Sequence, residues 1–198
     1  MIPTPGQCYR LMDEYGMLAN IREHSILVAR ISVYLAAGLR AVGLDIPHPL
    51  VLAAALLHDI AKTPCLASKK DHAREGRRIC LAHGFAELAD AVGEHVVLAQ
   101  PFSPLVLTAT EVVYYADKRV NHDQVVGLEE RLEYIMDRYG QNDPLIHEKI
   151  RDNFARCQLE EEKIYRFLST RTEELAALLA REPQPFPGGE EPEERLIA

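Results

Sequence analysis

The chain of 198 residues contains no tryptophan, only 11 glycines and no strongly apolar N-terminus. Alanine and leucine are abundant instead, and this composition favours helices over sheets. The first residues, MIPTPGQCYR, include no apolar segment like the centre of a signal peptide. Arg, His or Asp interrupts each longer apolar run before it reaches the length of a membrane span. These absences predict a cytoplasmic protein that does not cross a membrane.

Long basic runs are also missing, and the formal net charge is −8 at pH 7. Wrapping a long nucleic acid requires clustered Lys and Arg that neutralise phosphates, so this class of partner is not expected. The short basic pairs Lys69-Lys70 and Arg77-Arg78 are still compatible with a small phosphorylated ligand.

The four cysteines, Cys8, Cys65, Cys80 and Cys157, lie far apart in the sequence. No two of them have the short spacing of a zinc knuckle or of a redox motif. They are therefore expected to be ordinary thiols in a reducing compartment.

Hydrophobic periodicity and capping residues indicate an all-α protein. Asn20 and Glu23 resemble a capping box, and VLAAALLHDIA is apolar nearly all round, as expected for a central buried helix. A loop is predicted at Thr63-Pro64, and the polar stretch 160–163 is expected to bend or break the last helix. The first predicted helix starts at Thr4-Pro5, the second runs from Asn20 toward Gly43, and the third starts at Pro47. The fourth runs from Asp71 to Gly84, the fifth spans 85–95, and the sixth runs from Ser103-Pro104 to about Asp117. The seventh spans 127–139, and the last runs from Asp143-Pro144 to about Leu178.

These elements divide the chain into three parts. Residues 1–140 are expected to form one helical domain, and residues 141–181 a C-terminal helical extension that packs on this core or on a partner. Residues 182–198 are dominated by Pro, Gly and Glu and predict a disordered tail.

The doublet His58-Asp59, at the end of the apolar helix, needs a chemical explanation. An unpaired carboxylate is costly to bury, whereas a divalent cation would satisfy it. Imidazole with carboxylate suits Zn, Fe, Mn, Co or Ni. Because neighbouring helical residues diverge by about 100°, the pair can serve a metal only at a helix end, or with Asp59 bridging two ions. The alternative is a buried His bonded to a carbonyl, with the Asp as a helix-end group.

Three further residues are candidates for the same site. His24 lies on the apolar stripe of its helix, His95 follows Gly93 at an expected kink, and Asp117 comes late in VVYYADKR. Each alone is more simply a satisfied core residue. Together, in one helical domain, they favour a metal.

The ordered set His24, His58-Asp59 and Asp117 resembles the H…HD…D pattern of the HD-domain metal-dependent phosphohydrolase superfamily. The local sequences REHS, LLHDIAK and YYADK carry this resemblance, which covers roughly residues 20–122. It implies an HD-domain helical bundle, followed here by an extra long helix or helical pair. It also implies cleavage of a phosphate ester or anhydride, of a nucleotide or dinucleotide, by a metal-activated hydroxide.

One branch of that superfamily carries two more histidines and binds two metals. DHAREGRRI resembles its H…GA segment, with His72 as the ligand, and AVGEHVVL resembles its next segment, with His95 as the ligand. This branch includes bacterial hydrolases of symmetrical dinucleoside tetraphosphates, but Val-Val-Leu-Ala-Gln-Pro follows His95 where that branch usually has Thr and Gly. The resemblance thus implies two divalent metals, one held by His24, His58, Asp59 and Asp117, the other by His72 and His95, with Asp59 bridging.

The remaining histidines have simpler explanations. His83 would share a helix face with His72, but about 16 Å away, so both cannot serve one cluster. Its place before Gly84 suits an imidazole at a helix C-terminus. The other three histidines, His48, His122 and His147, are expected at the surface. Of these, His122 is a candidate for the pocket rim.

Phosphate hydrolysis develops negative charge that nearby cations must stabilise. Lys62, one turn after His58, is the best candidate and joins Asp59 in the predicted catalytic pair, although a solvated lysine is equally expected there. Arg22 is a weaker candidate, and Arg119 could reach the pocket rim.

Two other functions are compatible with these residues. Some HD-like proteins resemble this six-ligand set yet hold a mixed-valent di-iron centre and oxidise their substrate with dioxygen. The domain could also be a nucleotide sensor or interaction module without turnover, with residues 144–180 docking a partner or a second copy in a homodimer. A hydrolase acting on a small phosphorylated substrate is favoured, because it is the commoner activity of the superfamily.

Overall fold

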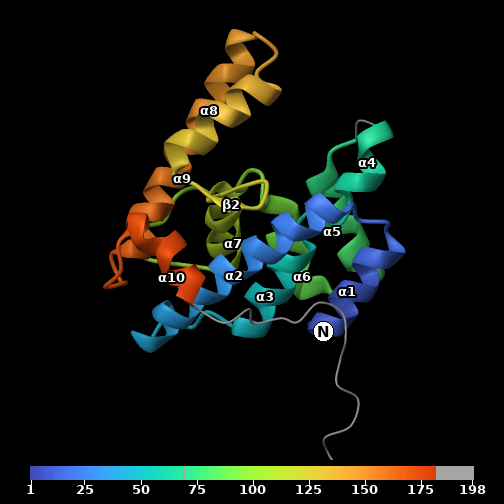
Figure 1. Ribbon diagram of the computed structural model, residues 1–198. Coiled ribbons are helices and arrows are strands. Elements are labelled where there is room, and N and C mark those ends of the chain that lie inside the picture. Colours follow the sequence, from blue (N-terminus) through green and yellow to red (C-terminus); the bar gives the residue numbers. More distant parts are fainter. Residues whose placement is uncertain (69, 182–198) are drawn as a thin grey trace, which may run out of the picture.

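The computed structural model describes residues 1–68 and 70–181, and most of these residues are helical (Figure 1). The predicted all-α HD-type bundle is confirmed, whereas the predicted tail 182–198 lies outside the described residues. The elements are α1 (Pro5–Glu14), α2 (Ala19–Ala41), α3 (His48–Leu57), α4 (Lys62–Ser68), α5 (His72–Ala82), α6 (Ala86–Glu94), α7 (Ala109–Lys118), β1 (Val120–Asn121), β2 (Gln124–Val125), α8 (Leu128–Tyr139), α9 (Pro144–Tyr165), the short 3-10 helix η1 (Thr172–Glu174) and α10 (Leu175–Arg181).

The apolar helix α3 lies at the centre of the bundle. Every residue from Val51 to Leu57 is buried, and α1, α2, α6 and α7 all contact this helix. The stretch His48–Ser68 is long and apolar enough to cross a membrane by length and composition alone, but 67% of its most apolar window is buried inside the protein. Such burial is consistent with the core helix of a soluble protein.

Three helix starts that rest on local capping are confirmed. Thr4, Asp71 and Asp143 each accept a hydrogen bond, through a side-chain oxygen, from a backbone N–H two or three residues later. These bonds satisfy amide groups that have no partner inside the helix, which is why the sequence signal is reliable.

The expected start of the second helix at Asn20 is wrong by two residues. Leu18 is the N-cap of α2, and no side-chain cap bond is present. The backbone N–H of Leu18 donates instead to Oγ1 of Thr63, 3.1 Å away. A contact between segments far apart in the sequence therefore replaces the local capping box.

Two boundaries around the motifs also differ from expectation. Thr63-Pro64 lies inside α4 rather than in a loop, because proline is tolerated in the first turn of a helix. Helix α7 does not begin at Ser103-Pro104 but after Thr108, which forms a complete capping box with Glu111.

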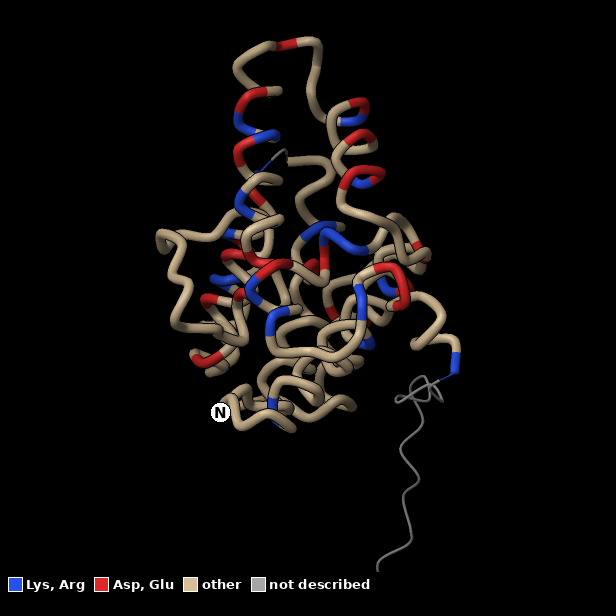
Figure 2. Tube along the Cα trace, turned by 90° about the vertical axis from the view of Figure 1, so that its left-hand side faces the viewer, with Lys and Arg blue, Asp and Glu red and all other residues tan. Residues whose placement is uncertain are grey.

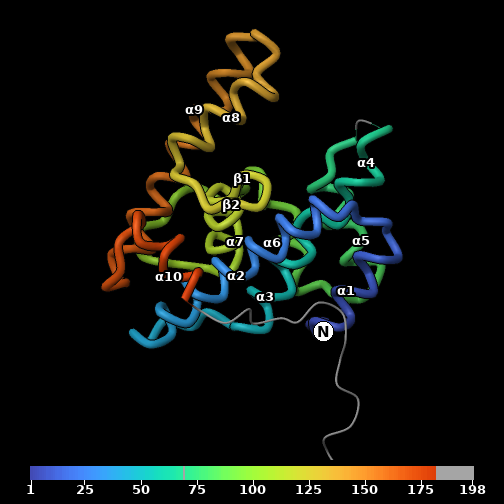
Figure 3. The backbone as a smooth tube through the Cα atoms, in the orientation of Figure 1, coloured from blue at the N-terminus to red at the C-terminus, as the bar shows by residue number. Residues whose placement is uncertain are grey.

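Helices α8 and α9 contact each other and project together from the rest of the molecule (Figures 1 and 3). Acidic and basic residues are interspersed along this projecting pair (Figure 2). The chain then returns to the core, where the Tyr114 hydroxyl of α7 donates to the backbone carbonyl of Asn153 in α9, 2.7 Å away. The expected boundary at residue 140 falls in the turn between α8 and α9, and the division into core and extension stays a prediction.

The polar stretch 160–163 does not break α9, which continues to Tyr165. Glu160 and Lys163 are buried, and Lys163 Nζ lies 2.6 Å from Glu160 and 2.8 Å from Glu111 of α7. Charges that look like a solvent-exposed interruption in the sequence therefore attach α9 to the core.

Arg119 is buried and does not reach a pocket rim. Its guanidinium donates to the carbonyl of Val126 (2.7 Å), to the carboxylate of Glu161 (3.2 Å) and to the carbonyl of Thr172 (3.1 Å). It thus ties the end of α7 to the segment after β2, to α9 and to η1.

Candidate metal centre

The six side chains predicted as metal ligands meet where several helices begin or end. His58 is the C-cap of α3 and is followed by Asp59, while His95 is the C-cap of α6. Asp117 is the next-to-last residue of α7, His72 is the first residue of α5, and His24 comes from α2. The carbonyl ends of α3, α6 and α7 carry partial negative charge, which favours a cation at this point.

Asp59 lies in the middle of this cluster and is almost fully buried. Its Oδ1 atom is 3.3 Å from Nε2 of His72 and 3.5 Å from Nε2 of His95. Its Oδ2 atom is 3.5 Å from Nε2 of His58 and 4.0 Å from Nε2 of His24. The two oxygens of one carboxylate therefore face two separate pairs of imidazoles.

Asp117 joins only one of these pairs. Its Oδ1 atom lies 3.0 Å from Nε2 of His24 and 3.6 Å from Nε2 of His58. Two groups of side chains could each hold an ion, because the candidate ligand atoms within each group lie within 4.8 Å of one another. The first group is His24, His58 and Asp59, and the second is Asp59, His72 and His95, so the two groups share Asp59.

Backbone carbonyls hold three of the four rings. A carbonyl only accepts hydrogen bonds, so the Nδ1 atom of each ring carries the proton. In the neutral ring Nε2 then presents its lone pair to the cluster, as in imidazoles that bind metal while a backbone carbonyl holds the other nitrogen. The acceptors are the carbonyl oxygens of Ala55 for His58 (2.7 Å), of Val92 for His95 (2.7 Å) and of His122 for His24 (3.2 Å).

These donors fit a divalent ion better than a closed hydrogen-bond network. Among the described residues, Nε2 of His58 and Oδ1 of Asp59 are buried without a hydrogen-bond partner. The Nε2 atoms of His72 and His95 lie 3.2 Å apart, as two nitrogens each about 2.0–2.1 Å from one ion can. Unsatisfied buried polar atoms are costly, and a bound cation would remove that cost.

Residues 21–139 match the HD domain in a comparison with protein families, and all six clustered residues fall in this range. The chain belongs to the HD domain family. Searches of curated proteins and of solved structures found no match. HD domains are generally metal-dependent hydrolases of the phosphohydrolase type, and the buried His and Asp groups agree with that class.

The ionisable groups of this HD domain influence one another strongly. Burial by itself would lower the pKa of His58, but the carboxylates of Asp59 and Asp117 outweigh it and raise the pKa to about 9. Burial lowers the pKa of His95 to about 4, despite the nearby Asp59 carboxylate. The pKa values of both carboxyl groups lie well below the usual range, because neighbouring cations outweigh the effect of burial. Without a metal, His58 is therefore protonated on both ring nitrogens and positively charged at neutral pH, whereas His95 is neutral, with its single proton on Nδ1.

Lys62, the first residue of α4, lies at the edge of the cluster. Its Nζ donates to Oδ2 of Asp59 at 2.7 Å. Burial lowers the pKa of Lys62, but the Asp59 carboxylate more than offsets this and raises it. The side chain is thus a charged neighbour of the central carboxylate, and its catalytic role stays a prediction.

Lys118 is a neighbour of the cluster that the sequence reasoning missed. It is buried, and its Nζ donates to the backbone carbonyl of His95 and, at 3.2 Å, to Oδ2 of Asp117. It also lies 4.1 Å from the centroid of the Tyr114 ring. One ammonium therefore links the end of α6 to the end of α7, and the only sequence signal was its place after Asp117 in YYADK.

Other candidate residues lie outside the cluster. Arg22 forms an ion pair with Asp13. His83 is the C-cap of α5, as expected, and its Nε2 lies 3.0 Å from the Tyr15 hydroxyl. Of the three histidines expected at the surface, His122 is exposed, whereas His48 and His147 are partly exposed.

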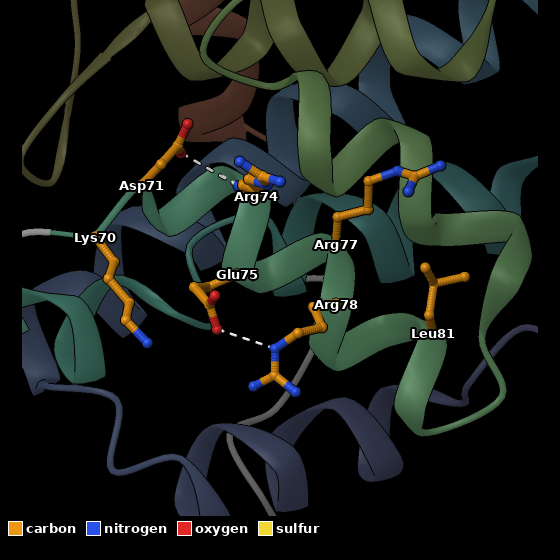
Figure 4. A pocket seen from close by; sticks show the side chains of 7 residues that line it. All are labelled: Lys70, Asp71, Arg74, Glu75, Arg77, Arg78 and Leu81. Atoms are coloured by element: carbon orange, nitrogen blue, oxygen red, sulfur yellow. Dashed lines mark hydrogen bonds and ion pairs between the residues drawn. The ribbon is translucent and has the colours of Figure 1, made fainter.

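A cavity of about 470 Å³ lies along α5 (Figure 4). None of the six clustered residues lines it. Two of its four cations are already paired, because Arg77 lies 3.0 Å from Asp90 and Arg78 lies 3.0 Å from Glu75. The cavity is lined by Lys70, Asp71, Arg74, Glu75, Arg77, Arg78 and Leu81. Its basic residues are compatible with a phosphorylated ligand, but neither the six predicted metal ligands nor Lys62 lines it.

Proposed function

We propose that this HD domain protein hydrolyses a phosphate ester or anhydride of a nucleotide or dinucleotide, using two divalent metal ions. The observation that carries the proposal is the division of the cluster around Asp59. Each carboxylate oxygen faces its own pair of imidazole Nε2 atoms, at distances of 3.3 to 4.0 Å. Bacterial hydrolases of symmetrical dinucleoside tetraphosphates are one branch that this arrangement would fit.

In this proposal the two oxygens of Asp59 serve different ions. The first ion would be held by His24, His58, Asp59 and Asp117, and the second by Asp59, His72 and His95. The ions would be Fe, Mn, Co, Ni or Zn, which histidine and carboxylate ligands accept. Bound metal supplies acidity to water and positive charge to the phosphate oxygens.

The protein's own groups prepare this chemistry. Backbone carbonyls fix three imidazoles in one tautomer, so their Nε2 atoms do not have to reorient when a ligand binds. Lys62 forms an ion pair with Asp59, and in this proposal its ammonium would stabilise the negative charge that develops on a phosphate oxygen. Hydrolysis forms a bond between the oxygen of water and phosphorus and breaks the bond to the leaving oxygen, which takes the proton. No covalent bond to the protein is required.

The decisive experiment is elemental analysis of protein purified without chelators, followed by a panel of phosphorylated substrates after metal reconstitution. Phosphate release without dioxygen is expected. Dioxygen consumption with alcohols or phosphonates, and no phosphate release, would support a mixed-valent di-iron oxygenase instead. Nucleotide binding without any product would support a sensor or interaction module. We further propose a cytoplasmic location and a homodimer, to be examined by fractionation and by light scattering.

A further inference from the structure

The turn between β1 and β2 supports one imidazole of the cluster from its outer side. Nδ1 of His24 donates to the backbone carbonyl of His122 at 3.2 Å, while Nε2 of the same ring lies 3.0 Å from Asp117. His122 and Asp123 are the two residues between the paired strands. The two nitrogens of an imidazole point to opposite sides of the ring, so the turn lies on the side of His24 away from the cluster, where a ligand that extends from the metals past this ring would meet it.

The backbone of His122 has a φ of 56°, in the left-handed region. This conformation is unfavourable for residues other than glycine and is best tolerated by Asn and Asp in hairpin turns. A glycine would supply the same carbonyl to His24 without strain. Histidine is itself among the residues that are enriched in this region, and the exposed imidazole of His122 is accessible to a ligand.

Helix α8 brings a second ring and a cation to the same turn. The rings of His122 and Tyr134 meet edge to face, with centroids 5.2 Å apart and planes at 78°. The guanidinium of Arg131 lies 5.4 Å from the centroid of Tyr134 and donates to Oδ1 of Asn121 at 3.2 Å. Arg131 is only 9% exposed, and no carboxylate of the described residues forms an ion pair with it. A buried cation without an acidic partner favours an anionic ligand nearby.

We propose that His122 and Tyr134 form a stacking site for the base of a nucleotide whose phosphates reach the metal cluster. Arg131 holds the Tyr134 ring and adds positive charge beside the phosphates. Stacking of a base on aromatic side chains is a general mode of nucleotide recognition. The inference rests on the proposed hydrolase function and narrows its substrates to nucleotides, in preference to phosphates that lack a base.

The test compares ATP with inorganic tripolyphosphate, which has the same phosphates but no nucleoside, on the full-length, metal-loaded protein. His122→Gly keeps the carbonyl and suits the turn, so it removes only the ring. We expect this variant to raise KM for ATP about tenfold and to leave KM for tripolyphosphate unchanged. Tyr134→Leu should give the same selective loss, and Tyr134→Phe should keep the preference for ATP. Glu133→Gln, an exposed neighbour on α8, is the control.

Equal effects of His122→Gly on both substrates, or no effect on either, would overturn the stacking site. Calorimetric titration of both compounds separates this result from failure of the hydrolase proposal. If neither is hydrolysed, but the wild type binds ATP more tightly and His122→Gly loses that difference, the stacking site stands and the hydrolase does not. If both are hydrolysed without any preference that depends on His122, the hydrolase stands and the stacking site does not.

Discussion

The Nε2 atoms of His72 and His95 lie 3.2 Å apart, although one residue begins α5 and the other follows the end of α6. Two neutral imidazoles cannot both accept across such a distance, so a proton or a metal ion has to mediate the contact. Oδ1 of Asp59, which lies 3.3 Å from His72, completes a three-sided group. This contact is the observation that most favours the proposed second metal ion.

His72→Ala is therefore expected to lower the metal content from two ions toward one per chain, because only His95 and Asp59 would remain in that group. Elemental analysis of protein purified without chelators measures this change. His83→Ala is the matched control, since His83 lies at the other end of α5 and contacts Tyr15 instead. An unchanged metal count in His72→Ala would mean that the second site is misplaced or absent.

Asp59→Ala should remove both metals and abolish hydrolysis, because this carboxylate faces both groups. Metal catalysis commonly contributes several kcal/mol, so a loss of at least about 10³-fold in kcat/KM is expected. Asp90→Ala, which removes an exposed surface carboxylate, should keep wild-type activity and metal content. Full activity of Asp59→Ala would be incompatible with the proposed metal catalysis.

Lys118→Met should weaken metal binding without removing a ligand. The substitution keeps an apolar chain beside Tyr114 but removes the ammonium that contacts Asp117 and the carbonyl of His95. Loss of such supporting contacts typically lowers metal affinity by about 10- to 100-fold. Competition with a chelator of known affinity measures the change, and equal affinities in wild type and variant would show that Lys118 only fills space.

Metal affinity should rise with pH across the neutral range. Because the pKa of His58 is raised to about 9 in the metal-free protein, a metal ion must displace its proton below that pH. One displaced proton gives an increase of about tenfold in affinity per pH unit, from about pH 7 to 8.5. His95, with a pKa lowered to about 4, is already neutral and adds nothing to this slope. Calorimetry in two buffers of different ionisation enthalpy counts the released protons, and a flat affinity would contradict the charge state of His58.

The parts of this fold that the sequence predicts are those that depend on local chemistry. Asp71 and Asp143 mark helix starts because their side chains bond to amides only two or three residues away. The doublet His58-Asp59 was conspicuous because two polar residues end an otherwise apolar, buried helix. The grouping of all six candidate ligands was implied by the resemblance to the HD-domain superfamily rather than by these local signals, and their binding of metal stays a prediction.

The parts that the sequence does not predict depend on remote partners. The sequence suggests that Arg119 can reach the pocket rim, but Glu161 of α9 and backbone carbonyls hold it inside the protein. Lys118 had no visible role because its second contact is the carbonyl of His95, in another helix. Long cationic side chains can reach several neighbours, so their environment depends on tertiary packing rather than on the residues beside them.

Lys163 provides a test of this remote packing. Its ammonium lies between Glu160 and Glu111 and donates to backbone carbonyls of the segment before α7. Arg156 contacts Glu160 at 2.7 Å but stays 3.9 Å from Glu111, so it does not replace the lysine. Lys163→Met should therefore leave a buried carboxylate uncompensated and lower the free energy of unfolding by about 3–5 kcal/mol.

Urea unfolding of this variant measures the loss. Lys149→Met, on the exposed part of the same helix, is the matched control and should change stability by less than about 0.5 kcal/mol. Metal content should be normal in both variants, because neither lysine contacts the cluster residues. Wild-type stability of Lys163→Met would mean that apolar contacts, such as those of buried Cys157 and Ile164, hold α9 against the core without help from this ion pair. In that case the polar stretch 160–163 would be tolerated in the core rather than required for it.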